Sequence, residues 1–115
     1  MRIGLMEMRT FCQEFFPGTK NETFVHESAG VADLITSCLG GRNRKCAEAF
    51  VRTGKPFAKL EDEMLGGQKL QGVQTAQEIH EFLVQRERVD AFPLFNFVYR
   101  IAFDGLDPHT LVDCI

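Results

Sequence analysis

Apolar residues recur at spacings of three and four through the opening of the chain, as they do on one face of an α-helix. The pattern stops at Pro17-Gly18, a pair that ends helices, and the polar stretch Thr19–Thr23 is expected to be a connection. The opening segment is therefore predicted to be a largely buried helix. Its apolar positions are Ile3, Leu5, Met6, Met8, Phe11, Cys12, Phe15 and Phe16.

The same spacing predicts further helices along the rest of the chain. Their expected bounds are Glu27–Leu39, Asn43–Thr53, Pro56 to about Met64, Thr75 to about Arg88, and a helix that begins at Pro93. Thr75 and Glu78 have the spacing of a capping box, and Asp107-Pro108 favours a last short turn. No stretch alternates apolar and polar residues as a half-buried strand does. The fold class is therefore expected to be all-α, a single domain over residues 1–115 with about six or seven helices.

Two segments carry further structural expectations. The helix from Pro93 is apolar around most of its circumference, so it is predicted to run through the centre of the domain. Gln68–Gly72 follows the glycine pair Gly66-Gly67 and ends at another glycine, so it is predicted to be a loop.

Composition is that of an ordinary soluble domain, with 44% hydrophobic and 25% charged residues. No apolar run approaches the roughly 20 residues that span a bilayer, and no leader pattern is visible, so no membrane partner and a cytoplasmic location are expected. The net charge is −3, yet residues 42–69 hold seven Lys/Arg against four Asp/Glu. A basic segment on an acidic chain favours a small anionic ligand over nucleic acid.

Several chemical motifs are absent or incomplete. The four cysteines lack C-x-x-C spacing, so they are expected to be free thiols, and no metal site is predicted. Gly67 and Gly72 have P-loop separation, but Val73-Gln74 follows in place of Lys and Ser/Thr. No G-x-G-x-x-G follows a strand, so these residues alone do not make the usual dinucleotide site.

The clearest candidate site is Gly40-Gly41-Arg42-Asn43, where one helix ends and the next begins. Glycine lets backbone approach a ligand closely, and amides at a helix start attract anions. Arg42 can hold a phosphate with two hydrogen bonds, and Asn43 can donate another. The alternative is a helix C-cap at Gly40 followed by a solvated basic face.

The stretch Glu27-Ser-Ala-Gly-Val-Ala-Asp-Leu-Ile-Thr-Ser-Cys38, followed by Gly40-Gly-Arg-Asn-Arg-Lys45, closely resembles the C-terminal domain of eukaryotic-type cytosolic NAD-dependent glycerol-3-phosphate dehydrogenases. Gly4-Leu-Met-Glu-Met8, Gly67-Gln-Lys-Leu-Gln-Gly72 and Phe92-Pro-Leu-Phe95 resemble the same family in the same order. The resemblance implies the helical, substrate-binding half of a two-domain oxidoreductase. Enzymes of the family interconvert dihydroxyacetone phosphate and glycerol 3-phosphate with NAD(H), so the resemblance implies NAD as the cofactor.

The resemblance also implies roles for individual residues. Arg42 and Asn43 match the motif for the substrate phosphate, and Arg42 also reaches toward the cofactor. Lys69 and Gln71 match the loop that closes over the dinucleotide.

Asp33 matches an acid that orients the family's catalytic lysine. Ser37 follows Asp33 by one helical turn, where many relatives carry Thr, so it keeps the hydroxyl without the methyl.

The family's Rossmann domain and its lysine precede the region that this sequence matches. The 115 residues alone are therefore expected to be inactive, and the full enzyme is expected to be a homodimer. An alternative from another class is a non-catalytic helical module that binds a phosphometabolite or dimerises through its Phe-rich faces.

Overall fold

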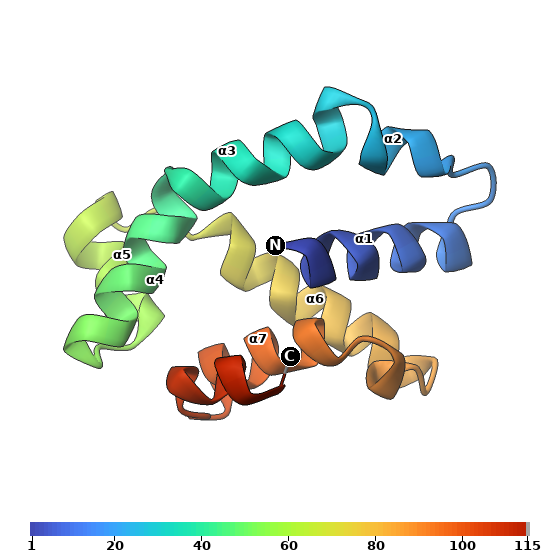
Figure 1. Cartoon of the computed structure of the whole chain (residues 1–115). Coiled ribbons are helices and arrows are strands. Elements are labelled where there is room, and N and C mark those ends of the chain that lie inside the picture. The colour runs from blue at the N-terminus through green and yellow to red at the C-terminus, as the bar shows by residue number, and fades with distance from the viewer. Residues whose placement is uncertain (115) are drawn as a thin grey trace. The chain divides into compact units, whose positions relative to one another are not determined.

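The computed structural model describes residues 1–114, and the chain divides into two compact units, Met1–Gly40 and Gly41–Ile115. The boundary falls at the glycine pair, where Gly41 has a φ of 92° that other residues rarely adopt. The regular structure of the described residues is helical throughout, with seven α-helices and short π and 3-10 turns (Figure 1). This confirms the predicted all-α class.

The N-terminal unit begins with α1, which spans Arg2–Phe15 and ends before Pro17-Gly18 as predicted. The prediction that this helix is largely buried was wrong, because Glu7 is its one buried residue and Ile3 and Met6 are exposed. A short helix, α2 (Asn21–Val25), lies where the sequence predicted only a polar connection, so that prediction was wrong. The Arg9 guanidinium donates a hydrogen bond to the Asn21 side-chain oxygen at 2.9 Å and so ties the start of α2 to α1. This partner lies twelve residues away, which is why local composition did not reveal it.

The predicted helix Glu27–Leu39 forms in two parts. A π-helical turn at Ser28–Ala32 leads directly into α3, which spans Asp33–Leu39. Gly30 is buried in this turn, and a Cβ there would clash with the backbone of Phe24 in α2. Glycine therefore permits a close approach between α2 and the π turn.

The second unit contains four α-helices, two of which end at glycines as the sequence predicted. The helices are α4 (Arg42–Thr53), α5 (Phe57–Leu65), α6 (Gln71–Gln85) and α7 (Pro93–Phe103). Gly54 and Gly66 end α4 and α5 in the left-handed conformation that suits glycine. Helix α4 packs on α5, and α6 packs on α7 (Figure 1). The buried apolar core consists of Cys46, Leu60, Leu70, Leu83 and Phe92.

Two predictions about this unit were wrong. Helix α6 begins at Gln71, one turn before Thr75, so Thr75 lies inside the helix and makes no capping box. Helix α7 does not run through a core, since none of its residues is buried and Val98 and Phe103 are exposed. One part of α7 instead borders open cavities, which Val98, Ile101, Ala102 and Phe103 help to line.

After α7 the chain makes a 3-10 turn at Pro108–Cys114. The backbone N–H of His109 donates to the Asp107 carboxylate at 3.0 Å, which confirms the predicted cap at Asp107-Pro108. This hydrogen bond is the main reason that the pKa of Asp107 lies below its ordinary value of 3.8, and a second hydrogen bond from the His109 ring acts in the same direction.

Candidate anion-binding site

The first turn of α4 presents Arg42 and Asn43 to solvent. Gly41 precedes them and has no side chain that could accept hydrogen bonds from the amides of this turn. These amides carry the positive end of the α4 dipole, which favours a bound anion. The Arg42 guanidinium lies over the segment before α6, where it donates to the Gln68 side-chain oxygen at 3.4 Å.

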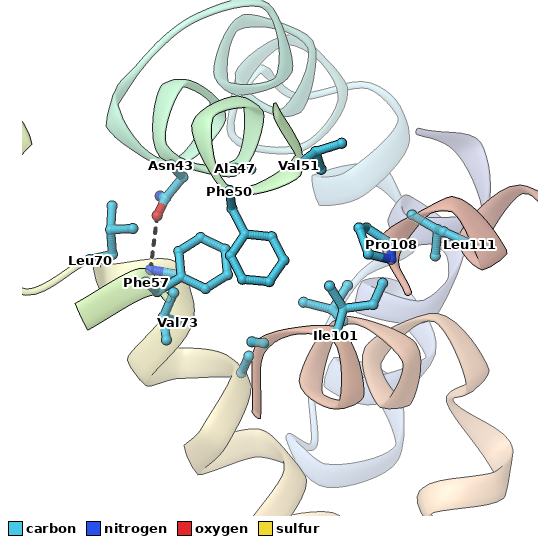
Figure 2. Close-up of a pocket in the computed structure, with 14 residues that line it drawn as sticks. Asn43, Ala47, Phe50, Val51, Phe57, Leu70, Val73, Ile101, Pro108 and Leu111 are labelled. Carbon is cyan, nitrogen blue, oxygen red and sulfur yellow. Dashed lines mark hydrogen bonds between the residues drawn. The ribbon is translucent and has the colours of Figure 1, made fainter. Parts of the chain in front are cut away.

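Asn43 joins the first turns of two helices. Its side-chain oxygen accepts a hydrogen bond from the backbone N–H of Gly72, the second residue of α6, at 3.1 Å (Figure 2). A backbone N–H can only donate, so this contact fixes which end of the Asn43 amide faces α6. The Nδ2 group of Asn43 is thereby left to donate to a ligand oxygen.

Gly72 allows this close contact because it has no side chain. A Cβ at this position would lie 2.7 Å from the Asn43 Oδ1 atom, inside ordinary contact distance. The sequence predicted that Gly72 would end a loop, but it belongs to the first turn of α6. Its role in the structure is to let α6 begin directly against Asn43.

Lys69 and Gln71, the predicted cofactor-binding residues, flank the start of α6 and are both exposed. Lys69 contributes to a cavity of about 580 Å³ that Glu61 and two glutamines, Gln74 and Gln77, also line. Gln71 is the first residue of α6 and directly precedes Gly72. The predicted loop is therefore shorter than expected, and Gln71 belongs to the helix.

Asp33 and Ser37, the predicted catalytic residues, lie on α3 in the N-terminal unit. Asp33 is the first residue of α3, directly after the π turn, and its backbone N–H bonds back to that turn. Both side chains are exposed and project one helical turn apart. The close backbone approach at Gly30 therefore fixes the position from which α3 presents Asp33.

An apolar cavity of about 350 Å³ adjoins Asn43 in the second unit (Figure 2). The rings of Phe50 and Phe57 stack there with their centroids 4.3 Å apart, and Ile101 and Leu111 complete much of the lining. Ala47 and Val51 are exposed and also line this cavity. Asn43 is the main polar side chain among the lining residues.

The described part of the chain contains free thiols, but no metal-binding cluster and no helix that could span a membrane. Residues 1–114 contain no group of three or more His, Cys, Asp or Glu side chains that could hold a metal ion. Cys12, Cys38 and Cys46 are free thiols, and burial raises the pKa of Cys12 above its ordinary value. Within the same residues, every helix is too short or too polar to cross a bilayer.

Sequence reasoning missed two polar residues that shape the site, Gln68 and Glu61. Gln68 accepts from Arg42, and the buried carboxylate of Glu61 accepts from the Leu70 N–H at 2.7 Å. The sequence does indicate that Glu61 is unusual, because it lies at a position of the apolar stripe of α5. The positions of that stripe are Phe57, Leu60, Glu61, Met64 and Leu65. An acid in such a stripe must find hydrogen-bond donors.

The chain is all-helical, and the first turns of α4 and α6 meet at Asn43. Together with the Arg42 guanidinium and the Asn43 amide, these helix starts suit a small phosphorylated ligand. The sequence model of the family described as "NAD-dependent glycerol-3-phosphate dehydrogenase C-terminus" matches residues 1–113. This chain belongs to that family.

Individual relatives agree with the family match. A glycerol-3-phosphate dehydrogenase [NAD(+)] of Schizosaccharomyces pombe is 56% identical over the whole chain, and the cytoplasmic enzyme of Mus musculus is 53% identical. The structure of glycerol-3-phosphate dehydrogenase from Saccharomyces cerevisiae has a TM-score of 0.93 at 46% identity over 97% of this chain, which is 32% of that chain. The 115 residues span 31% and 33% of the length of the S. pombe and mouse proteins.

Proposed function

We propose that this chain forms the substrate-binding domain of an NAD-dependent glycerol-3-phosphate dehydrogenase, which interconverts dihydroxyacetone phosphate and glycerol 3-phosphate. The observation that carries the proposal is the junction of α4 and α6 at Asn43, with Arg42 beside it. The S. pombe relative is named as an NAD(+) enzyme of this kind and the mouse relative as a cytoplasmic one, and a cytoplasmic location is proposed here. The intact enzyme is proposed to be a homodimer.

In this proposal the substrate phosphate binds over the first turn of α4. The Arg42 guanidinium provides two parallel donors, which match the geometry of a phosphate. The Nδ2 group of Asn43 and the first-turn amides of α4 donate to the remaining oxygens. Because Arg42 contacts Gln68, its side chain lies over the segment that precedes α6.

The residues at the start of α6 fit a dinucleotide. Lys69 is an exposed cation, Gln71 is an exposed amide, and both adjoin the positive end of the α6 dipole. Lys69, Gln71 and Arg42 would hold the pyrophosphate or the nicotinamide portion of NAD(H). When bound, the nicotinamide exchanges a hydride with the substrate carbon.

Asp33 and Ser37 are proposed to orient and electrostatically stabilise a lysine that protonates the substrate carbonyl oxygen. In the family that the sequence resembles, this lysine precedes the segment matched here. The carboxylate of Asp33 favours the charged ammonium form of such a lysine, and the Ser37 hydroxyl offers it a second hydrogen-bond partner. Both side chains are exposed on α3, as a contact to another part of an enzyme requires.

A chimera tests the proposal directly. The 115 residues replace the matching part of the S. pombe relative, which aligns over the whole of this chain. The chimera is expected to oxidise NADH with dihydroxyacetone phosphate. Asp33→Asn, which keeps the shape and removes the charge, is expected to lower kcat about a hundredfold with little change in KM. A folded but inactive chimera beside an active parent would count against the proposed function.

A further inference from the structure

Glu61 is a buried carboxylate for which the proposed function has no role so far. It lies on α5 and is only 6% exposed, although an isolated buried charge is costly. Its side chain accepts a hydrogen bond of 2.7 Å from the backbone N–H of Leu70, and its backbone carbonyl accepts one of 3.1 Å from Gly67. One residue therefore holds both ends of the segment Gly67–Leu70.

The contact at Leu70 is a strong one. Leu70 is the N-cap residue of α6 and is itself buried at 3% exposure. A carboxylate at this place interacts with the positive end of the α6 dipole, and a charged acceptor makes a shorter and stronger bond to N–H than a neutral one. Glu61 thus acts as the cap that the sequence had assigned to Thr75, and it sets where α6 begins.

The segment held in this way carries two exposed polar side chains, Gln68 and Lys69. Gln68 accepts from the Arg42 guanidinium, so the path of the segment decides where Arg42 is held. We propose that Glu61 is a positioning residue, which fixes the segment Gly67–Leu70 so that Gln68 holds Arg42 ready for the substrate phosphate. This inference rests on the proposed function, because it assigns Arg42 to that phosphate.

Three substitutions in the chimera separate positioning from mere folding. Glu61→Leu keeps the apolar stripe of α5 filled but removes the acceptor, and it is expected to raise the KM for dihydroxyacetone phosphate about tenfold. Glu61→Gln keeps an acceptor oxygen, so its KM is expected to remain within about threefold of that of the unsubstituted chimera. Glu61→Asp keeps the charge but places it one methylene farther from the Leu70 N–H, so its KM should also rise. This variant tests the inference even if Glu61→Leu fails to fold.

The matched control is Glu63→Leu, on the same helix but in an exposed ion pair with Lys55. It is expected to leave KM unchanged. Hydrogen exchange at the Leu70 amide should accelerate in the Glu61→Leu and Glu61→Asp chimeras and not in the control. An active chimera whose Glu61→Leu and Glu61→Asp forms keep the parent KM would overturn this inference alone. A folded chimera without activity would overturn the proposed function, and with it the role assigned to Glu61.

Discussion

One end of the Asn43 amide makes an observed structural contact and the other end has a proposed role in binding, and substitution can separate the two. The Oδ1 end accepts from the Gly72 N–H at 3.1 Å and stabilises the start of α6. The Nδ2 end is proposed to donate to the substrate phosphate. Asn43→Asp keeps an acceptor for Gly72 but replaces the donor with a negative charge, whereas Asn43→Ala removes both groups.

The two variants are therefore expected to rank in one order for stability and in the opposite order for affinity. Asn43→Ala should lower the free energy of unfolding by about 0.5–1 kcal/mol, the lower part of the range for a hydrogen bond, because this one is exposed. Asn43→Asp should leave that free energy equal or raise it by about 0.5 kcal/mol, since its charge lies at the positive ends of α4 and α6. Urea denaturation of the 115-residue chain, followed by circular dichroism, measures both.

Affinity should follow the opposite order. Loss of a donor to a charged phosphate costs about 1.5–3 kcal/mol, so Asn43→Ala should raise the KM for dihydroxyacetone phosphate in the chimera about 10- to 100-fold. Asn43→Asp adds repulsion between two negative charges and should weaken binding by a further factor of about ten or more. An aspartate variant that binds the phosphate as well as the parent, or that is less stable than the alanine variant, would refute this reasoning.

Two further predictions concern the folding of each unit. Gly30→Ala should cost about 3 kcal/mol in the unfolding free energy of the chain, because the new methyl group meets the backbone of α2; a loss below about 1 kcal/mol in urea denaturation would contradict the packing described. Asp107 has a lowered pKa in the folded chain, so its hydrogen bond with His109 stabilises the last turn above the unfolded pKa and is lost as pH falls through the folded value. An NMR titration of the Asp107 carboxyl group should therefore give a midpoint below 3.8, and a midpoint at or above 3.8 would contradict it.

Helix existence could be predicted from the sequence because periodicity and glycine stops act locally. The ends of α4 and α5 at Gly54 and Gly66 depend on one residue's backbone freedom, and both were predicted correctly. The start of α6 was wrong because its amides are capped by Glu61 and Asn43, which lie 9 and 29 residues away from their partners. Periodicity carries no information about such distant acceptors.

Burial was harder to predict than helicity. The apolar circumference of α7 indicated a central helix, yet this helix borders cavities and none of its residues is buried. The hydrophobic pattern shows which faces can be buried, but the arrangement of neighbouring helices decides which of them are.

The candidate site was predictable only in part. Arg42 and Asn43 stand out beside a glycine pair, and the structure gives both a contact with the segment around the start of α6. Gln68 carries no pattern of its own and gains meaning only through Arg42. The roles assigned to Asp33, Ser37, Lys69 and Gln71 come from family resemblance and stay predictions.

Binding of the substrate phosphate by Arg42 is best tested by a cycle that removes first the guanidinium and then the phosphate. The kcat/KM values of the unsubstituted chimera and of its Arg42→Ala form are measured at saturating NADH, so that any role of Arg42 in cofactor binding does not contribute. The two substrates are dihydroxyacetone phosphate and dihydroxyacetone, which lacks the phosphate. Arg42→Ala is expected to lower kcat/KM about a hundredfold for dihydroxyacetone phosphate and less than about threefold for dihydroxyacetone. Equal losses with both substrates would contradict it.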